Sequence, residues 1–309
     1  MLKNLACLHS TLDNLYYPPT KGDYDYFEGS PFESAANFRF PNASWAADAA
    51  MLAYARYQKT RMNEAEFNGI LSPHFNTRGM IGDCFVDNAS TGRGFFAGND
   101  DFAILAFRGT EKGNPHDVKA DLKFLPVDEA SLGGRSAGKV HWGFQDYLKP
   151  IWPRIKQLVD DYRSTNKNRE ICITGHSLGA AIATLAFHQI QDDHTSLYTF
   201  GCPRVGNQDF CDSLDKMAQT RPVYRFVDHE DVVTHVPLPG WIAGYQHPKC
   251  TIFLIDPQGG ITQADPPGES KVGEDLLLDY LEGTIVDPIP TPLADHSPVR
   301  YCHWISQKA

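Results

Sequence analysis

The sequence predicts a single domain of the α/β class, in which helices cover both faces of a mostly parallel sheet. Short apolar runs of strand length alternate along the 309 residues with longer segments whose apolar residues recur at helical spacing. The stretch ITGHSLGAAIA at 173–183 places a strand, a sharp glycine-flanked turn and a helix in direct succession. Parallel strands joined by right-handed crossovers place helices on both faces of a sheet. No linker rich in Pro, Gly or Ser divides the chain, so one domain, 1–309, is expected.

The first third of the chain is predicted to hold an arm, one helix and two strands. Residues 1–40, rich in Tyr, Pro and Asp, predict an irregular arm that lies over the body of the protein. Residues 44–58 predict a helix that begins at Ser44 as N-cap, with its apolar residues toward the core. These apolar residues are Trp45, Ala49, Leu52 and Tyr57. Strands are expected around Phe85 and at 101–107.

The rest of the chain alternates helices with strands. Residues 143–163 predict a long amphipathic helix, although Pro150 and Pro153 are expected to bend or restart it. The apolar face of this helix consists of Phe144, Leu148, Ile151, Ile155, Leu158 and Tyr162. The later predicted elements are a strand at 171–174, a helix at 178–191, a strand at 196–201, a helix near 207–218, a strand at 223–228, and a strand at 251–256 that forms a hairpin through the turn PQGG.

Charge and composition exclude several classes of partner. The chain carries 28 Lys plus Arg against 38 Asp plus Glu, a net charge of -10, and it has no basic run. This balance disfavours nucleic acid and anionic lipid as partners and favours neutral or interfacial substrates. No apolar run approaches the length of a membrane span, so no transmembrane segment is expected. The first residues lack the pattern of a secretory signal, which predicts a cytoplasmic protein or a mature or trimmed form of a secreted one.

The seven cysteines predict neither a metal site nor a disulfide framework. They form no C-x-x-C pair, and their density is far below that of a small disulfide-stapled domain. No spacing of His, Asp and Cys suggests a metal site, so no metal or organic cofactor is expected. Nothing in the sequence indicates the oligomeric state.

Ser177 is the candidate nucleophile. It lies between Gly175 and Gly179 in GHSLG, after an apolar strand and before a helix with almost no polar interruption. Such a serine must occupy a strained turn that exposes its Oγ, so the residues two positions away on either side must have almost no side chain. The two glycines meet this requirement, and Ala180 and Ala181 let the helix approach the strand closely.

A serine nucleophile needs a histidine to accept its proton and a carboxylate to orient that histidine, here in the chain order serine, acid, histidine. For the acid, Asp231 is preferred because it follows a predicted strand on a loop at the carboxyl end of the sheet. Asp228 and Glu230 stay open as alternatives. For the base, His296 is preferred because it follows a proline-rich loop and precedes a final helix, and His303 is the alternative.

Two backbone donors are expected to stabilise the oxyanion. The N–H of Leu178 begins the helix after the nucleophile and points toward the reaction site. The second donor is expected from the loop after an earlier strand, where Thr110 follows Gly109 in ILAFRGTE. Loss of one such donor typically costs roughly 3 kcal/mol of transition-state stabilisation.

Six short motifs are spread along the chain from residue 107 to residue 301. They are FRGT at 107–110, VHWGF at 140–144, TGHSLGAA at 174–181, TFGCPRVGN at 199–207, DVVTHVP at 231–237 and DHSPVRY at 295–301. Together and in this order they resemble the class 3, or fungal-type, triacylglycerol lipase family. The resemblance implies an alpha/beta-hydrolase fold with Ser177 as nucleophile, Asp231 as acid and His296 as base. It also implies an oxyanion hole of Thr110 and Leu178, and it selects Asp231 over its two neighbouring carboxylates.

A lid is expected at about 111–139, between the motifs FRGT and VHWGF. Val118, Leu122 and Leu125 give this segment an apolar face at i, i+4 and i+7, and the glycine-rich SLGGRSAGK resembles a flexible return segment. Members of the family commonly carry a tryptophan in the lid helix. This segment has none, so weaker anchoring to lipid is expected.

The resemblance and the candidate site imply a serine carboxylic-ester hydrolase, with a triacylglycerol lipase as the preferred function. The expected substrate is a lipid or other ester, met at a lipid–water interface, and the acyl-enzyme is expected to form on Ser177. The alternatives are a short- to medium-chain carboxylesterase, a feruloyl esterase and a phospholipase, since fold and catalytic residues do not determine the acyl or alcohol group. A non-catalytic lipid-binding module is the alternative from another class.

Overall fold

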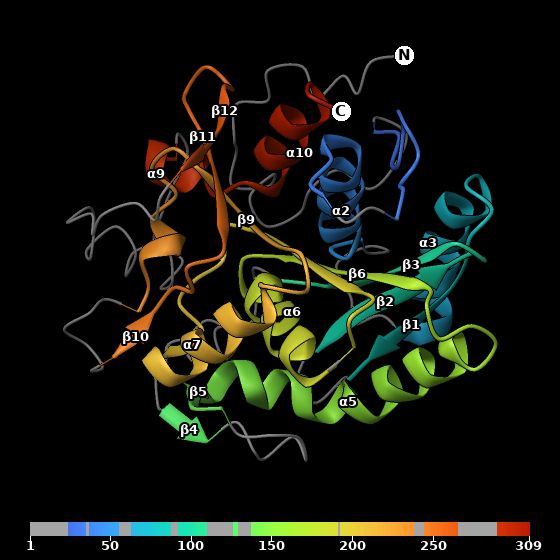
Figure 1. The fold of residues 1–309 in the computed structure, drawn as a ribbon. Coiled ribbons are helices and arrows are strands. Elements are labelled where there is room, and N and C mark those ends of the chain that lie inside the picture. Colours follow the sequence, from blue (N-terminus) through green and yellow to red (C-terminus); the bar gives the residue numbers. More distant parts are fainter. Residues whose placement is uncertain are drawn as a thin grey trace.

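The computed structural model describes residues 24–34, 37–55, 63–87, 92–109, 126–128, 137–190, 192–237, 244–264 and 289–309. A large sheet passes through the centre of this part of the molecule, and helices lie on both of its faces (Figure 1). The predicted α/β architecture is therefore confirmed.

The central sheet has eight strands among the described residues. In spatial order these are β1 (Ile81–Val86), β2 (Arg93–Gly98), β3 (Phe102–Phe107), β6 (Glu170–His176), β7 (Thr195–Phe200), β9 (Val223–Asp228), β11 (Thr251–Ile255) and β12 (Ile261–Ala264). The run from β3 to β11 is parallel, and antiparallel pairs complete both edges. The inner strands are continuous buried runs, as expected for parallel strands with helices on either side.

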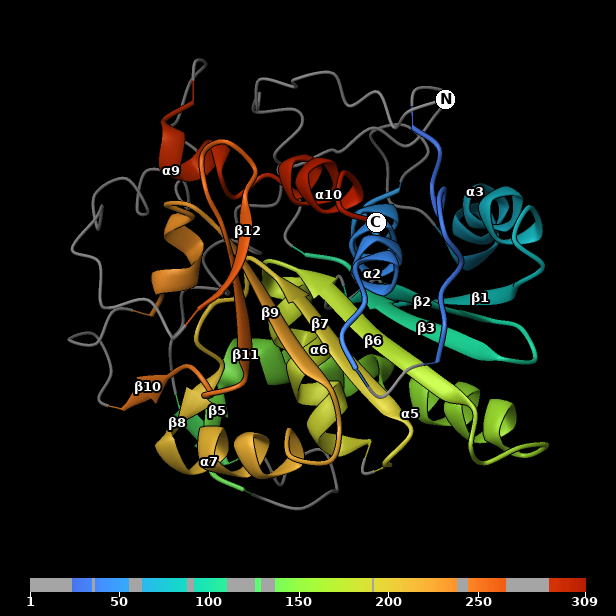
Figure 2. The same cartoon turned by 45° about the horizontal axis from the view of Figure 1, so that its top comes forward.

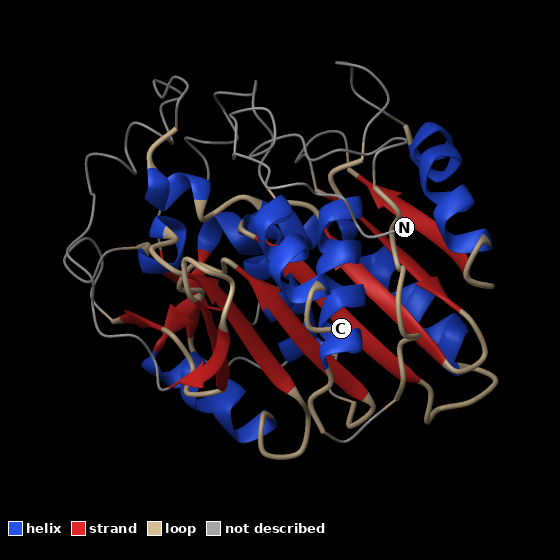
Figure 3. Cartoon of the chain, turned by 90° about the horizontal axis from the view of Figure 1, so that it is seen from above, coloured by secondary structure: helices blue, strands red, loops and turns tan. Residues whose placement is uncertain are grey.

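Two groups of helices cover the sheet. One face carries α2 (Phe40–Leu52), α3 (Glu64–Asn76) and α10 (Pro298–Ser306), and the other carries α5 (Trp142–Arg163), α6 (Leu178–Gln189) and α7 (Gln208–Met217). Figure 2 shows α2 and α10 together on one side of the strands and α5 and α6 on the other. From above, the strands lie side by side beneath the helices (Figure 3). The connections include η2 (Val232–His235) after β9 and α9 (Thr291–Ala294) before α10.

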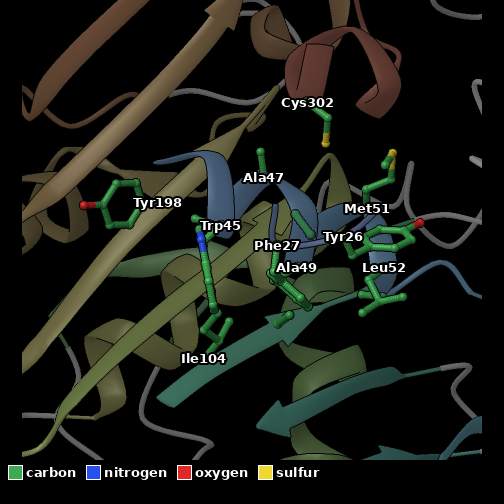
Figure 4. Close-up of a cluster of buried hydrophobic side chains, with 14 of the residues drawn as sticks. Tyr26, Phe27, Trp45, Ala47, Ala49, Met51, Leu52, Ile104, Tyr198 and Cys302 are labelled. Carbon is green, nitrogen blue, oxygen red and sulfur yellow. The ribbon is translucent and has the colours of Figure 1, made fainter. Parts of the chain in front are cut away.

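α2 is buried along nearly its whole length between the sheet and α10. Its many alanines let it approach β3 and β6 closely, because they add little bulk. Figure 4 shows Trp45 and Leu52 of this helix among Phe27 of the preceding segment and Ile104 of β3. Each large apolar side chain buried in such a cluster contributes about 1.5–3 kcal/mol to the free energy of unfolding. The helix is therefore a central part of the core on this face.

A buried carboxylate ties residues 24–34 to α2. Asp48 accepts hydrogen bonds from the hydroxyl of Tyr24 and from the backbone N–H of Phe27, the latter at 2.6 Å. Burial of a carboxylate is costly unless its oxygens accept hydrogen bonds, so these contacts fix this segment against the helix. Residues 24–34 and 37–39, within the predicted arm, form no helix or strand. Residues 1–23 lie outside the described residues.

A smaller antiparallel sheet lies beside α5 and α7. Its strands, in spatial order, are β10 (Tyr245–Gln246), β8 (Gly206–Asn207), β5 (Lys139–His141) and β4 (Pro126–Asp128). These strands are too short to show a period of two, and the sequence did not predict them.

Most of the elements predicted after residue 140 are found close to their expected bounds, including the hairpin of β11 and β12. The N-cap prediction at Ser44 was wrong, because α2 begins at Phe40 and Ser44 is buried inside it. Pro41 favours the earlier start, since a missing N–H costs nothing in the first turn of a helix. The helix also ends at Leu52, before the expected residue 58, and Tyr57 lies outside the described residues.

The prolines of α5 do not restart the helix, which is continuous over 22 residues. Pro150 and Pro153 each remove one backbone hydrogen bond. The helix nevertheless buries Leu148, Ile151 and Ile155 on the face that packs against α6. This tertiary packing outweighs the local cost of the prolines.

Two elements near the first edge of the sheet were not predicted. β2 contains two glycines in six residues, which obscures its strand character. α3 had a usable signal, because Asn63 and Glu66 form a capping box: each side chain accepts a hydrogen bond from the other residue's backbone N–H at 3.0 Å. Pro73 inside the helix works against that signal.

Candidate active site

Ser177 lies on the sharp turn between β6 and α6. Its backbone has φ 59° and ψ -130°, a left-handed conformation that residues with a side chain rarely adopt. A Cβ on Gly175 would collide with the backbone of Gly179, and a Cβ on Gly179 would collide with the carbonyl of Phe107 on β3. The predicted strand, turn and helix are therefore confirmed, and both glycines are required by close backbone approach.

Three side chains from separate segments meet at the carboxyl end of the sheet. Ser177 Oγ lies 2.8 Å from His296 Nε2, and His296 Nδ1 lies 2.9 Å from both carboxylate oxygens of Asp231. All three side chains are buried. A carboxylate only accepts hydrogen bonds, so Nδ1 carries the proton and donates it to Asp231. Nε2 is then the acceptor for the serine hydroxyl, which is the geometry needed to remove the serine proton.

Further donors hold the carboxylate of Asp231. The backbone N–H of Val233 donates to Oδ1 at 3.0 Å, and the hydroxyl of Tyr301 donates to Oδ2 at 2.6 Å. Burial, together with the Asp231 carboxylate, raises the pKa of Tyr301 well above its ordinary value, so the phenol stays protonated and able to donate. Gly201, with φ +58°, lies beside this carboxylate. A Cβ there would lie 2.6 Å from Asp231 Oδ2 and 3.0 Å from His296 Nδ1, so only glycine fits.

The alternative acids and base have other surroundings. Asp228 is buried and pairs with Arg300, whose Nε lies 2.8 Å from Oδ2. Burial, partly offset by Arg300, raises the pKa of Asp228 to about 7. Glu230 is exposed, and His303 Nε2 lies 2.9 Å from the amide nitrogen of Gln307 on the surface of α10. The carboxylate that faces His296 Nδ1 at hydrogen-bond distance is that of Asp231.

An ionic network joins the loop that carries the acid to the loop that carries the base. Arg300 Nη2 lies 3.0 Å from Asp295 Oδ1, and Asp295 Oδ2 lies 3.1 Å from His229 Nδ1. Asp295 directly precedes His296, and His229 lies two residues before Asp231. The network therefore fixes the position of the loop with Asp231 relative to the loop with His296. Arg300 and Asp295 were not predicted as site residues, although both stand in the motif DHSPVRY.

Of the two candidate oxyanion donors, the structure describes Leu178 but not Thr110. Leu178 is the first residue of α6, where a backbone N–H has no partner inside the helix and lies at its positive end. Thr110 lies outside the described residues. Gly109, the residue before it, lies against the turn that carries Ser177, because a Cβ there would come within 2.8 Å of the carbonyl oxygen of His176.

The predicted lid lies almost entirely outside the described residues. This holds for Val118, Leu122 and Leu125, whereas β4 and residues 137–139 are described. In the described ranges, no group of three or more His, Cys, Asp or Glu side chains could hold a metal ion. No helix in the same ranges has both the length and the apolar composition needed to cross a membrane. The six cysteines that the structure describes are all buried.

The sequence is similar to class 3 lipases. Residues 104–241 match the family model described as Lipase (class 3). A secreted mono- and diacylglycerol lipase of Malassezia restricta is 32% identical over 159 residues, which are 50% of this chain and 49% of that protein. The chain thus spans about half the length of the curated relatives it matches.

Solved lipase structures share the fold. A mono- and diacylglycerol lipase from Aspergillus oryzae superposes with a TM-score of 0.59 at 22% identity, over 84% of this chain and 95% of that one. A lipase from Rhizopus microsporus var. chinensis superposes with a TM-score of 0.57 at 25% identity, over 85% and 88%. The fold is therefore that of an alpha/beta-hydrolase. The matched family model and the relative from Malassezia restricta show that this part of the chain is similar in sequence to class 3 lipases.

Proposed function

We propose that this chain is a serine hydrolase of acyl esters, in which Ser177 is the nucleophile, His296 the general base and Asp231 the residue that orients the imidazole. The proposal rests on two consecutive hydrogen bonds. Ser177 Oγ lies 2.8 Å from His296 Nε2, and His296 Nδ1 lies 2.9 Å from Asp231. A serine needs such a chain of hydrogen bonds to become nucleophilic near neutral pH.

The proposed reaction proceeds through an acyl-enzyme. Ser177 Oγ attacks the ester carbonyl while its proton passes to His296 Nε2, and the carbonyl oxygen becomes an oxyanion that the backbone N–H groups of Leu178 and Thr110 stabilise. The C–O bond to the alcohol then breaks, and His296 gives the proton to the leaving oxygen. Water attacks the acyl-enzyme, His296 accepts its proton, and the free acid leaves as Ser177 regains its hydrogen.

We propose acylglycerols as the substrate class, met at a lipid–water interface. The net charge of -10 and the absence of a basic run in the sequence favour a neutral substrate over an anionic one. The sequence favours triacylglycerol, whereas the name of the Malassezia restricta relative favours mono- and diacylglycerol. The proposed layout is one domain over 1–309, with residues 1–40 as an arm and about 111–139 as a lid that bears Val118, Leu122 and Leu125.

The nucleophile is tested by Ser177→Ala against the wild type, with p-nitrophenyl esters from C2 to C16. The change is expected to lower kcat by about 10⁴-fold or more, because no other group forms the acyl-enzyme. Ser213→Ala is a matched control. The Ser213 hydroxyl also lies 2.9 Å from a histidine nitrogen, Nε2 of His188, but Ser213 is on α7, outside the candidate triad. Equal activity of Ser177→Ala and wild type would refute the assignment, and no activity in either protein would favour a lipid-binding module.

The substrate is tested with emulsions of tri-, di- and monoacylglycerol, each taken across its solubility limit. A lidded lipase should gain activity when the interface forms, and the favoured acylglycerol should have the highest kcat/KM. A peak at C2 to C4 esters without interfacial gain would indicate a carboxylesterase. Faster release from a phospholipid or a feruloyl ester would indicate one of the other two alternatives.

A further inference from the structure

A second imidazole, that of His176, lies against the ring of His296. The two ring centroids are 4.6 Å apart with an interplanar angle of 35°, and His176 is 2% exposed. His176 is the last residue of β6 and directly precedes Ser177. The candidate base therefore packs on a side chain of the same strand that carries the candidate nucleophile.

Both ring nitrogens of His176 have hydrogen-bond partners. Nε2 lies 2.6 Å from the backbone carbonyl oxygen of His296, and Nδ1 lies 2.9 Å from the hydroxyl of Tyr54, in the turn after α2. A carbonyl oxygen only accepts, so Nε2 carries the proton and donates. In the neutral ring Nδ1 is then an acceptor, to which the Tyr54 hydroxyl can donate. With these partners the neutral ring has one tautomer, with its proton on Nε2.

The surroundings of His176 favour the same neutral form. Burial and the neighbouring His296 lower the pKa of His176 well below its ordinary value. The titratable groups whose rings lie beside it, among the described residues, are Tyr54, His296 and Tyr301. During acylation His296 becomes an imidazolium. A positive charge on His176 would then face a like charge at 4.6 Å, which a neutral ring avoids.

Tyr54 also contacts the loop that leads to the predicted oxyanion donor. A Cβ on Gly109 would collide with the Tyr54 hydroxyl, and that hydroxyl lies 3.4 Å from the carbonyl oxygen of His176. Gly109 is therefore required here by the approach of the tyrosine. The hydroxyl lies where the β3 loop, the end of β6 and the end of α2 meet.

We propose that Tyr54 and His176 form a positioning pair for the candidate base: Tyr54 fixes the tautomer of His176, and His176 holds the backbone of His296 so that Nε2 faces Ser177. This rests on the proposed function for its kinetic consequence. It assigns a role to two residues outside the candidate triad. The pair acts on the backbone of His296 and so complements Asp231, which acts on the ring.

The kinetic test uses Tyr54→Phe, His176→Leu and His176→Gln on the ester found in the substrate screen. Loss of one hydrogen bond is expected to lower kcat by about tenfold in the first two variants, with KM within about twofold. His176→Gln keeps an N–H that can reach the His296 carbonyl, so it should recover part of kcat relative to His176→Leu. The matched controls are Tyr224→Phe, which removes the hydroxyl of a buried tyrosine near the start of β9, and His188→Gln on α6.

The pH dependence of kcat separates positioning from a merely structural role. Without the Tyr54 hydroxyl, Nδ1 of His176 loses the partner that fixes its tautomer, and the ring holds the His296 carbonyl less firmly. The imidazolium that forms on His296 is then positioned less well, so the acid limb of log kcat in Tyr54→Phe should move, while the limb of Tyr224→Phe stays in place. Unchanged kcat and acid limb in both Tyr54→Phe and His176→Leu would overturn the proposal.

A second measurement tests the positioning role of Tyr54 and His176 without relying on any ester hydrolysis. The proton on His296 Nδ1, shared with Asp231, is observed by NMR in the folded protein without substrate. Its resonance should shift or broaden in His176→Leu and recover in His176→Gln, even if no ester is hydrolysed. An unchanged resonance in folded His176→Leu would refute the positioning role, whatever the activity of the wild type.

Discussion

At the scale of single residues, the surroundings of Asp231 explain how one carboxylate can orient an imidazole. Its two oxygens both face His296 Nδ1 at 2.9 Å, and the N–H of Val233 and the hydroxyl of Tyr301 occupy further acceptor positions. A carboxylate with this many donors cannot rotate freely, so the ring it holds stays in one orientation. Gly201 makes the approach possible, because any side chain there would overlap the carboxylate.

Tyr301→Phe tests this description of Asp231. The change removes a 2.6 Å hydrogen bond to a buried carboxylate, a bond of a kind worth about 1.5–3 kcal/mol, and the carboxylate should become less well oriented. We expect kcat to fall by about tenfold with little change in KM, since no substrate contact is lost. Steady-state kinetics and urea unfolding of the same samples check this. A fall in stability alone, with kcat of the folded enzyme intact, would show that the hydroxyl matters only for folding.

At the scale of elements, the turn between β6 and α6 depends on close approach of backbones. The start of α6 lies directly on β6 and on the end of β3, as the collisions predicted for a Cβ on Gly175 or Gly179 show. This contact brings the end of β3 close to the N-terminus of α6, directly after Ser177. The oxyanion donors proposed for Leu178 and Thr110 depend on this arrangement.

Gly179→Ala is expected to be strongly destabilising, because the added methyl meets the backbone carbonyl of Phe107, which cannot move without disturbing β3. Overpacking of this kind typically costs about 1–3 kcal/mol, and activity should fall as the turn shifts. Gly69→Ala is the control, since Gly69 is exposed on α3 and a Cβ there meets nothing within 4 Å. It should stabilise the protein by about 0.5–1 kcal/mol. Urea unfolding of both variants measures this, and equal effects would contradict the close approach.

At the scale of the whole molecule, the candidate site is assembled across a large part of the chain. Ser177 and His296 are 119 residues apart, and Asp231 and His296 are 65 residues apart. The sheet brings the carboxyl ends of β6 and β9 together, and α10 returns the last segment over them. Arg300 then joins Asp228 at the end of β9 to Asp295 beside the base, so the site and the C-terminal packing share one ionic network.

This network predicts how stability depends on pH. Burial raises the pKa of Asp228 from 3.8 to about 7, so the folded state binds this proton more tightly than the unfolded state. The contribution is fully present below about pH 4 and is lost as the pH rises through about 7, with a slope of at most about 1.4 kcal/mol per pH unit. Asp228→Asn should remove this decline, whereas Asp100→Asn, in an exposed ion pair with Arg169, should not.

The measurement is urea unfolding of the wild type and both variants at pH 5, 6, 7 and 8. As the pH rises from 5 to 7, the free energy of unfolding of the wild type should fall relative to that of Asp228→Asn. Over the same range, the wild type and Asp100→Asn should show the same change in this free energy. Parallel curves for wild type and Asp228→Asn would show that the carboxyl is ionised throughout, held so by Arg300.

Much of the fold could be predicted because its signals are local. The apolar runs at 171–174, 196–201 and 223–228 are strands in the structure, and the amphipathic run at 143–163 is a helix despite its prolines. The predictions failed where short-range signals conflict with packing. Ser44 has the chemistry of an N-cap, yet Pro41 and the buried face of α2 begin the helix earlier. β8 and β10 are two residues long and exist only because their partners are adjacent.

The sequence by itself determined the turn at Ser177, because a strained conformation and two close backbone contacts require glycines at two nearby positions, and this requirement is local. It could not choose among Asp228, Asp231 and Glu230 by spacing alone. It assigned no role to Tyr54, His176 or Tyr301, although the last two stand in the motifs TGHSLGAA and DHSPVRY. Only the tertiary structure decided which carboxylate faces His296 and which side chains hold that residue. The physical reason is that hydrogen bonds act over about 3 Å, whereas these groups are brought together only when the sheet, α2 and α10 have packed.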